Sequence, residues 1–233
     1  MNILVIENQI KEYNDIIDFL CDALPQAIIY PSSRENDPLH EKKFEGFMNH
    51  VHVALDYRYE REYREQAKNF IVGVVNGVVD GVIDEKKKID LMLMDHILGG
   101  AHHCHTGIDL ATYLNSSRGS GKSLPVIPVV FISRTPRNDK RVLGDSDKTF
   151  PEALHKDVYF GYEQYEEKYK GYCKWIDKGY HGDKLLESKS YGEHLIRAIK
   201  DTYEFSVQQN RKDAVVKKDG NHATQSNGLK MVE

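Results

Sequence analysis

Four apolar segments of the chain each run into polar residues whose side chains could act together. Carboxylate and amide oxygens are ligands for hard divalent cations. A lysine ammonium is a compact positive charge, and a serine hydroxyl donates hydrogen bonds to anions. If the segments are parallel strands, their polar ends meet at one edge and form a site for a cation and an anionic group. These residues are Glu7 with Asn8, Asp95, Ser133 and Lys178.

Alternating strands and helices are predicted to position these residues. The run at 89–94 is apolar apart from Asp90, which is typical of a strand covered on both faces. Alternation of this kind predicts an α/β fold with a doubly wound parallel sheet. The predicted strands are 2–7, 27–30, 89–94, 126–132 and 172–177. The predicted helices contain Ile10 to Leu20, Ile108 to Leu114 after a Thr106 cap, and a run marked by Leu185, Leu186, His194, Leu195, Ala198 and Ile199.

The segment 70–84 fits two structures. Its apolar pairs recur every four residues and suit a helix, whereas Asn76 and Gly77 could turn a β-hairpin. We favour the helix.

The length of 233 residues favours one elaborated domain at 1–205. Two stretches read as insertions in it, at about 32–60 and 134–171, the second with a helix near 152–168. From Ser206 the sequence is polar with few apolar anchors, so 206–233 is predicted to be a disordered tail.

Composition narrows the class of protein. A formal net charge of −4 with 29% charged residues shows no excess of positive charge of the kind that indicates nucleic-acid binding. No apolar run is long enough for a membrane helix, the start lacks the pattern of a secretory signal, and the three cysteines are odd in number and widely spaced. We expect a cytoplasmic protein with reduced thiols and no nucleic-acid or membrane partner.

Four sequence blocks together resemble the receiver domains of two-component response regulators. The resemblance covers 2–22, 89–114, 126–135 and 172–204, and the blocks follow in the family's order and strand context. It implies the flavodoxin-like sheet order 2-1-3-4-5 and phosphorylation of Asp95. The blocks are ILVIEN, DLMLMDHILGG with TGIDLATYL, PVVFISRTP and WIDKGY.

The resemblance also implies a role for each strand-end residue. A carboxylate attacks phosphorus poorly unless a cation offsets repulsion from the phosphoryl oxygens, so Mg²⁺ is expected. Its ligands would be Asp95, Glu7, the Asn8 side-chain carbonyl and the Ile97 main-chain carbonyl. Lys178 would neutralise the phosphoryl group and Ser133 would bind it. Trp175, at the position of the family's switch aromatic, would respond when Ser133 moves.

The main functional hypothesis is a signalling protein phosphorylated on Asp95 by a histidine kinase or phosphotransfer protein, with output through contact with a downstream protein. Its own chemistry would extend at most to self-phosphorylation from small donors and autodephosphorylation. Asn8 replaces a usual acid and Arg134 a usual small residue, so a pseudo-receiver that binds or scaffolds without phosphorylation is the alternative.

A third hypothesis, from the enzyme class, is a metal-dependent hydrolase that uses Asp95. It relies on a zinc interpretation of a histidine-rich loop that has no second ligand cluster at a recognised spacing. The loop residues are His96, His102, His103, Cys104 and His105.

Overall fold

A computed structural model describes the greater part of the 233-residue chain, and every structural statement below concerns that part. The ranges are 1–31, 40–56, 58–77, 88–96, 98, 107–116, 118–119, 124–133, 162–177 and 189–226.

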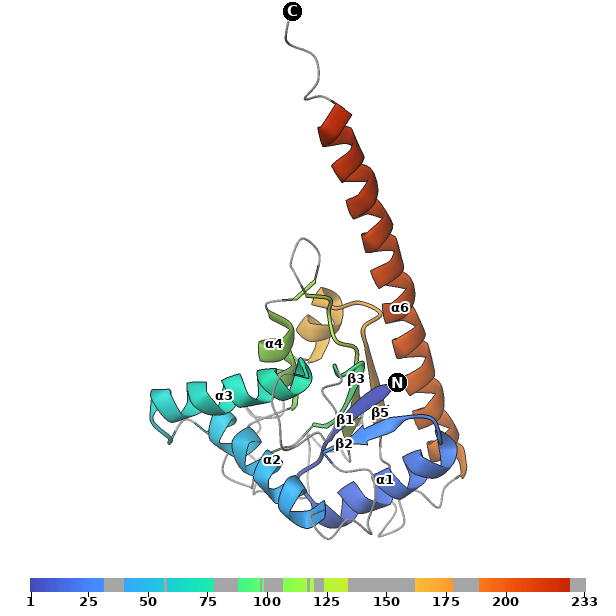
Figure 1. The fold of residues 1–233 in the computed structure, drawn as a ribbon. Helices are drawn as coiled ribbons and strands as arrows, with labels where there is room; N and C mark the ends of the chain where they lie inside the picture. The colour runs from blue at the N-terminus through green and yellow to red at the C-terminus, as the bar shows by residue number, and fades with distance from the viewer. Residues whose placement is uncertain are drawn as a thin grey trace, which may run out of the picture.

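The described residues form a five-stranded sheet in which all neighbouring strands are parallel (Figure 1). The strand order is β2-β1-β3-β4-β5, so the predicted doubly wound α/β fold with order 2-1-3-4-5 is confirmed. The bounds are β1 Asn2–Ile6, β2 Ile28–Tyr30, β3 Leu91–Asp95, β4 Val129–Ser133 and β5 Cys173–Asp177.

Helices cover both faces of this sheet (Figure 1). On one face lie α3 and α4, together with a short helical segment at 162–168 that contacts α4 through Asn115 and Tyr165. On the other face lie α1 and α6, which meet where Gly192 approaches the ring of Phe19. The bounds are α1 Ile10–Ala23, α2 His40–Leu55, α3 Arg61–Val75, α4 Gly107–Ser116 and α6 Lys189–Ser226.

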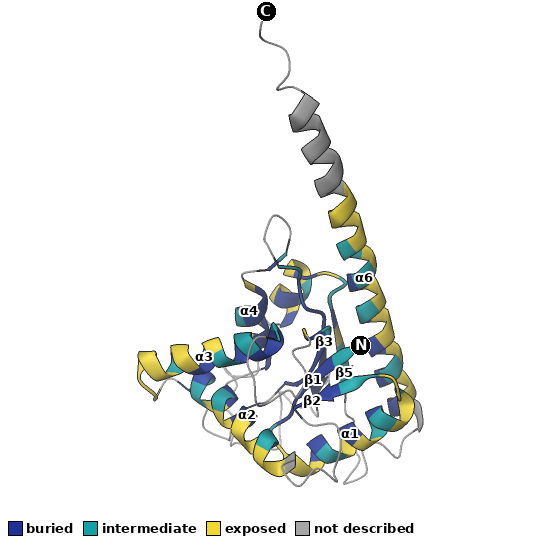
Figure 2. Cartoon of the chain, in the orientation of Figure 1, coloured by how far each residue is buried: buried dark blue, intermediate teal, exposed yellow. Residues whose placement is uncertain are grey.

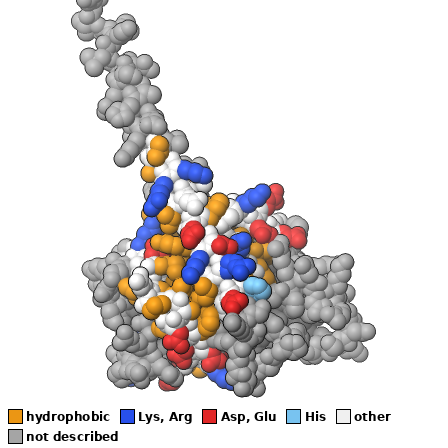
Figure 3. Space-filling model, turned by 90° about the vertical axis from the view of Figure 1, so that its right-hand side faces the viewer, with side chains coloured by type: hydrophobic (Ala, Val, Ile, Leu, Met, Phe, Trp, Pro, Cys, Tyr) orange, Lys and Arg blue, Asp and Glu red, His pale blue; other side chains and the backbone are white. Residues whose placement is uncertain are grey.

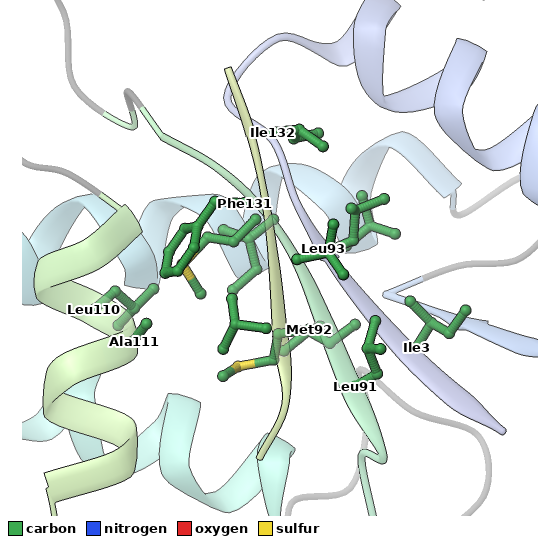
Figure 4. Packing of buried hydrophobic residues seen from close by; sticks show 14 of the residues in the cluster. Ile3, Leu91, Met92, Leu93, Leu110, Ala111, Phe131 and Ile132 are labelled. Carbon is green, nitrogen blue, oxygen red and sulfur yellow. The ribbon is translucent and has the colours of Figure 1, made fainter. Parts of the chain in front are cut away.

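The central strands are apolar on both sides because both sides are covered. Every residue of β3 and of β4 is buried. Figure 4 shows Leu110 and Ala111 of α4 beside Phe131 of β4. Removing a leucine or phenylalanine side chain from water contributes about 1.5–3 kcal/mol, so this layer is a main source of stability. The four predicted inward residues of α4, Ile108, Leu110, Ala111 and Leu114, are all buried.

The segment 32–60 contains a helix that the sequence analysis did not identify. In α2, Phe44, Phe47, Met48 and Val51 recur at helical spacing and are all buried. The ring of Phe44 lies 4.5 Å from that of Tyr13 in α1. The part of this segment that the structure describes therefore adds to the core.

The favoured helix at 70–84 is confirmed as far as Val75, and it begins earlier, at Arg61. The amide of Asn76 still donates to the Val72 carbonyl, and Gly77 takes a positive φ of 70°. A left-handed glycine directly after the last turn is a common helix terminator, so Asn76 and Gly77 end a helix here and form no hairpin. Residues 78–87 lie outside the described part.

The last helix extends well beyond the sheet (Figure 1). At 38 residues α6 is about 57 Å long. Its first turns carry buried Leu195, Ala198 and Ile199, while His194, which the sequence analysis grouped with them, is exposed. The helix continues to Ser226, so the structure has a helix where polar composition predicted a disordered tail from Ser206.

The surface around α6 has no dominant charge. Figure 2 shows that the outer side of the helix is exposed, and Figure 3 shows acidic and basic side chains interspersed on this face. Within the described ranges, no helix has the length and hydropathy needed to cross a bilayer.

Candidate functional site

The carboxyl ends of β1, β3 and β4 bring three of the predicted site residues to one edge of the sheet. Ile6 pairs with Met94, and Asp95 pairs with Ile132. Neighbouring parallel strands lie about 4.8 Å apart. The register therefore places Glu7 beside Asp95 and places Ser133, the last residue of β4, one position beyond the partner of Asp95.

The two acidic residues at this edge are withdrawn from solvent. Glu7 is fully buried and Asp95 is 7% exposed. One oxygen of Glu7, Oε1, accepts a hydrogen bond of 3.1 Å from the amide of Gln9, which fixes the turn that leads into α1. Two carboxylates side by side in a poorly solvated site favour a nearby cation.

Asn8 supplies a further oxygen next to Glu7. Its side-chain Oδ1 is buried and has no hydrogen-bond partner among the described residues. An unsatisfied buried amide oxygen costs free energy unless a ligand or water occupies it. Carboxylate and amide oxygens are the donor set that Mg²⁺ prefers, so Glu7, Asn8 and Asp95 fit the predicted metal.

Ser133 is buried and contacts a histidine that directly follows Asp95 in the sequence. The Ser133 Oγ and the Nδ1 of His96 lie 3.5 Å apart, and His96 is 2% exposed. The main-chain amide of His96 donates to the Ile132 carbonyl at 2.9 Å, so the β3–β4 ladder continues one residue past Asp95. This extension is what sets His96 and Ser133 side by side.

Trp175 lies in β5 opposite Phe131 of β4 and is half-buried. Its ring lies 4.8 Å from that of His96 at 61° and 5.0 Å from that of Tyr162 at 68°. Edge-to-face aromatic pairs of this kind stabilise by about 0.5–1.5 kcal/mol beyond their buried area. The predicted switch aromatic therefore connects the strand ends to the helical segment 162–168.

Several sequence-predicted residues lie outside the described part of the chain. Lys178 follows β5 directly in the sequence, and Ile97 follows His96. Arg134 and the histidine-rich loop beyond Leu98 also fall outside. Within the described ranges, no group of three or more histidine, cysteine or acidic side chains is gathered closely enough to hold a metal ion.

Comparison with known proteins does not identify a family, because no family model, no curated protein and no solved structure matches this chain. The functional argument therefore depends on the arrangement of the residues themselves.

Sequence reasoning did not predict that His96 packs against other residues of this site. His96 was considered only as a zinc ligand of the histidine-rich loop, whereas its side chain contacts Ser133 and Trp175. The available signal was its position directly after a buried strand, where one more hydrogen bond to the neighbouring strand can extend the ladder.

Proposed function

We propose that this chain is a receiver-like signalling protein that accepts a phosphoryl group on Asp95. In the step, an Asp95 carboxylate oxygen attacks the phosphorus of a phosphohistidine on a histidine kinase or phosphotransfer protein. The P–N bond breaks, the P–O bond of an acyl phosphate forms, and the imidazole leaves with a proton from solvent. The signal passes to a downstream protein by contact, and a cytoplasmic location is part of the proposal.

The observation that supports this most is the convergence of Glu7, Asp95 and Ser133 from three adjacent strands in the order 2-1-3-4-5. Ligand sites of such sheets lie outside the carboxyl ends of the strands. Here that edge offers an acceptor carboxylate, further oxygens for Mg²⁺ and a hydroxyl that can donate to a phosphoryl oxygen. The proposal assigns Lys178, which follows β5 in the sequence, to the phosphoryl charge.

Mg²⁺ would be held by Glu7, Asn8 and Asp95, with the Ile97 carbonyl as a further ligand from the sequence prediction. When bound, the ion offsets the negative charge that builds up as two anions approach each other. The protein itself positions the acceptor oxygen, excludes bulk water from it and supplies the Ser133 hydroxyl from the end of the neighbouring strand.

Intact-protein mass spectrometry tests the proposal. The protein is incubated with Mg²⁺ and acetyl phosphate or phosphoramidate. We expect one phosphoryl adduct in the wild type and none in Asp95→Asn. Asp90→Asn, one residue before the opposite end of β3, is the matched control and should keep the adduct. A folded wild type that gains no adduct, beside a control receiver that does, would refute the proposal.

A second candidate is a pseudo-receiver that binds a partner without phosphorylation. Two observations favour it: Asp95 is only 7% exposed, and Asn8 supplies a neutral amide where receivers usually have a second acid. This candidate predicts that no adduct forms and that partner binding is the same in the wild type and in Asp95→Asn.

A further inference from the structure

His96 is held at its main chain on both sides. Its amide donates to Ile132 of β4, and its carbonyl accepts a 2.9 Å hydrogen bond from the amide of Gly107 at the start of α4. Two fixed hydrogen bonds leave the backbone little freedom to rotate. The direction of the imidazole is therefore set by the sheet edge, and the side chain is almost completely buried.

The imidazole contacts two residues that the proposed function assigns to the switch. Its Nδ1 faces the Ser133 hydroxyl, and its ring packs edge-to-face against Trp175. Any displacement of the ring thus changes both contacts together, because close-packed interiors move in discrete steps.

The Ser133 contact is suited to exchange. At 3.5 Å it lies beyond the usual 2.7–3.2 Å range and is weak. A hydroxyl that donates to a phosphoryl oxygen makes a charge-assisted bond, which is roughly twice as strong as a neutral one. Ser133 therefore gains by leaving His96 for a phosphoryl group on Asp95.

The exchange has a consequence for His96. When Ser133 turns towards Asp95, the polar contact and the packing on that side of the imidazole both change, and a close-packed ring responds by taking a new position. Trp175 packs on that ring and also on Tyr162, whose own ring lies 5.8 Å from Phe131. A shift at His96 thus reaches the helical segment 162–168, on the face opposite α1 and α6.

We propose that His96 is a positioning residue that couples the partner exchange of Ser133 to the position of Trp175. This inference rests on the proposed function and adds a mechanism of regulation at the same site. His96 takes no part in phosphoryl transfer itself.

Two substitutions separate the contacts of His96. In His96→Phe the ring that packs on Trp175 remains while the nitrogen facing Ser133 is lost. In His96→Asn the side-chain amide retains a polar atom near the Nδ1 position while the ring is lost. Trp175 is the single tryptophan of the chain, so its fluorescence reports this place alone.

The experiment follows the Asp95 adduct by mass and Trp175 fluorescence in the same phosphorylated samples. We expect the adduct in the wild type and in both variants. We expect each variant to lose most of the phosphorylation-dependent fluorescence change. Ser133→Ala should also reduce the fluorescence change per phosphorylated molecule, and adding it to either variant should reduce that change no further. His194→Asn, at an exposed histidine of α6, should retain the wild-type change.

The outcomes separate this inference from the proposed function. An undiminished fluorescence change in either folded variant overturns the role of His96. The proposed function still stands in that case if the wild type carries the Asp95 adduct. Loss of the adduct in both variants also overturns it, because His96 would then act on transfer. A wild type that gains no adduct overturns both.

Discussion

Gly107 approaches the main chain of Asp95 more closely than any side chain would permit. A Cβ added at Gly107 would overlap the Asp95 carbonyl oxygen and would lie 2.7 Å from the Cγ of Met94. The amide of Gly107 also donates to the His96 carbonyl. The start of α4 thus presses directly on the end of β3 and fixes the direction of its last residues.

We predict that Gly107→Ala lowers the free energy of unfolding by about 1–3 kcal/mol, the usual cost of forcing extra volume into a packed site. Urea unfolding followed by circular dichroism measures it. Gly46→Ala is the matched control, because nothing lies within 4 Å of a Cβ there. That change, in the interior of α2, should raise stability by about 0.5–1 kcal/mol. Equal effects at the two glycines would contradict the close approach.

Glu7→Gln should weaken Mg²⁺ binding about tenfold or more, because affinity for a hard cation follows the number of charged oxygens around it. Asn8→Asp should strengthen it, since it adds a carboxylate beside Glu7. Titration calorimetry with Mg²⁺ alone provides the measurement, with Glu62→Gln on the exposed side of α3 as the control. If Glu7→Gln binds Mg²⁺ as the wild type does, Glu7 is no ligand.

Asn115→Ala should destabilise the fold by about 3 kcal/mol. Asn115 is fully buried, and its side chain bonds both main-chain groups of Ile127 and the hydroxyl of Tyr165. Removing this side chain leaves its buried polar partners without their hydrogen bonds, and each such group costs about 1–3 kcal/mol. Ser116→Ala, at the neighbouring exposed position, should change stability by less than about 0.5 kcal/mol. A thermal or urea midpoint shift that is similar for both would refute this role.

Stability should fall at alkaline pH through Tyr165. Burial raises the pKa of Tyr165 strongly, which outweighs the opposing hydrogen bond from Asn115. The phenol therefore stays neutral in the folded chain while the unfolded chain ionises near its ordinary pKa of about 10. The contribution is complete below about pH 10 and declines above it, by up to about 1.4 kcal/mol per pH unit.

Urea unfolding between pH 9 and pH 11 tests this. Tyr165→Phe should be less stable than the wild type at neutral pH, because it loses the Asn115 hydrogen bond, yet should show a shallower alkaline decline. Tyr63→Phe, at an exposed tyrosine of α3, should retain the wild-type decline. An unchanged slope in Tyr165→Phe would rule out the burial of its phenol as the cause.

The strands were predictable because their signal is local. Continuous apolar runs such as Leu91 to Met94 are typical of strands covered on both faces, and the polar residue that follows each run marks the carboxyl end of its strand. Parallel topology then placed Glu7, Asp95 and Ser133 at one edge without any knowledge of contacts.

The helices were harder because much of their surface is polar. In α2 polar residues such as Glu45, Asn49 and His50 lie between the buried Phe44, Phe47 and Val51 and masked the helical period. The first turns of α3 from Arg61 are largely exposed and carry little apolar signal. In α6, an anchored first half lets the helix continue through a polar sequence, since propagation is far easier than nucleation.

The contacts of His96 were beyond sequence reasoning for a different reason. Its contact with Ser133 depends on the β3–β4 register and on one further rung of the ladder, and its contact with Trp175 depends on side-chain packing across three strands. Neither the strand register nor the side-chain packing can be predicted from the spacing of residues in the sequence.

The crossover between β1 and β3 also governs the order of events during synthesis. The amide of Asn2 bonds the carboxylate of Asp90, 88 residues later in the chain. At about 5–20 residues per second, the first strand waits roughly 4–18 s after its own synthesis for its central neighbour. During that interval β2 is the available partner for NILVI, so the nascent chain carries an unprotected strand edge. The edge that joins Glu7 to Asp95 cannot assemble before β3 has been synthesised.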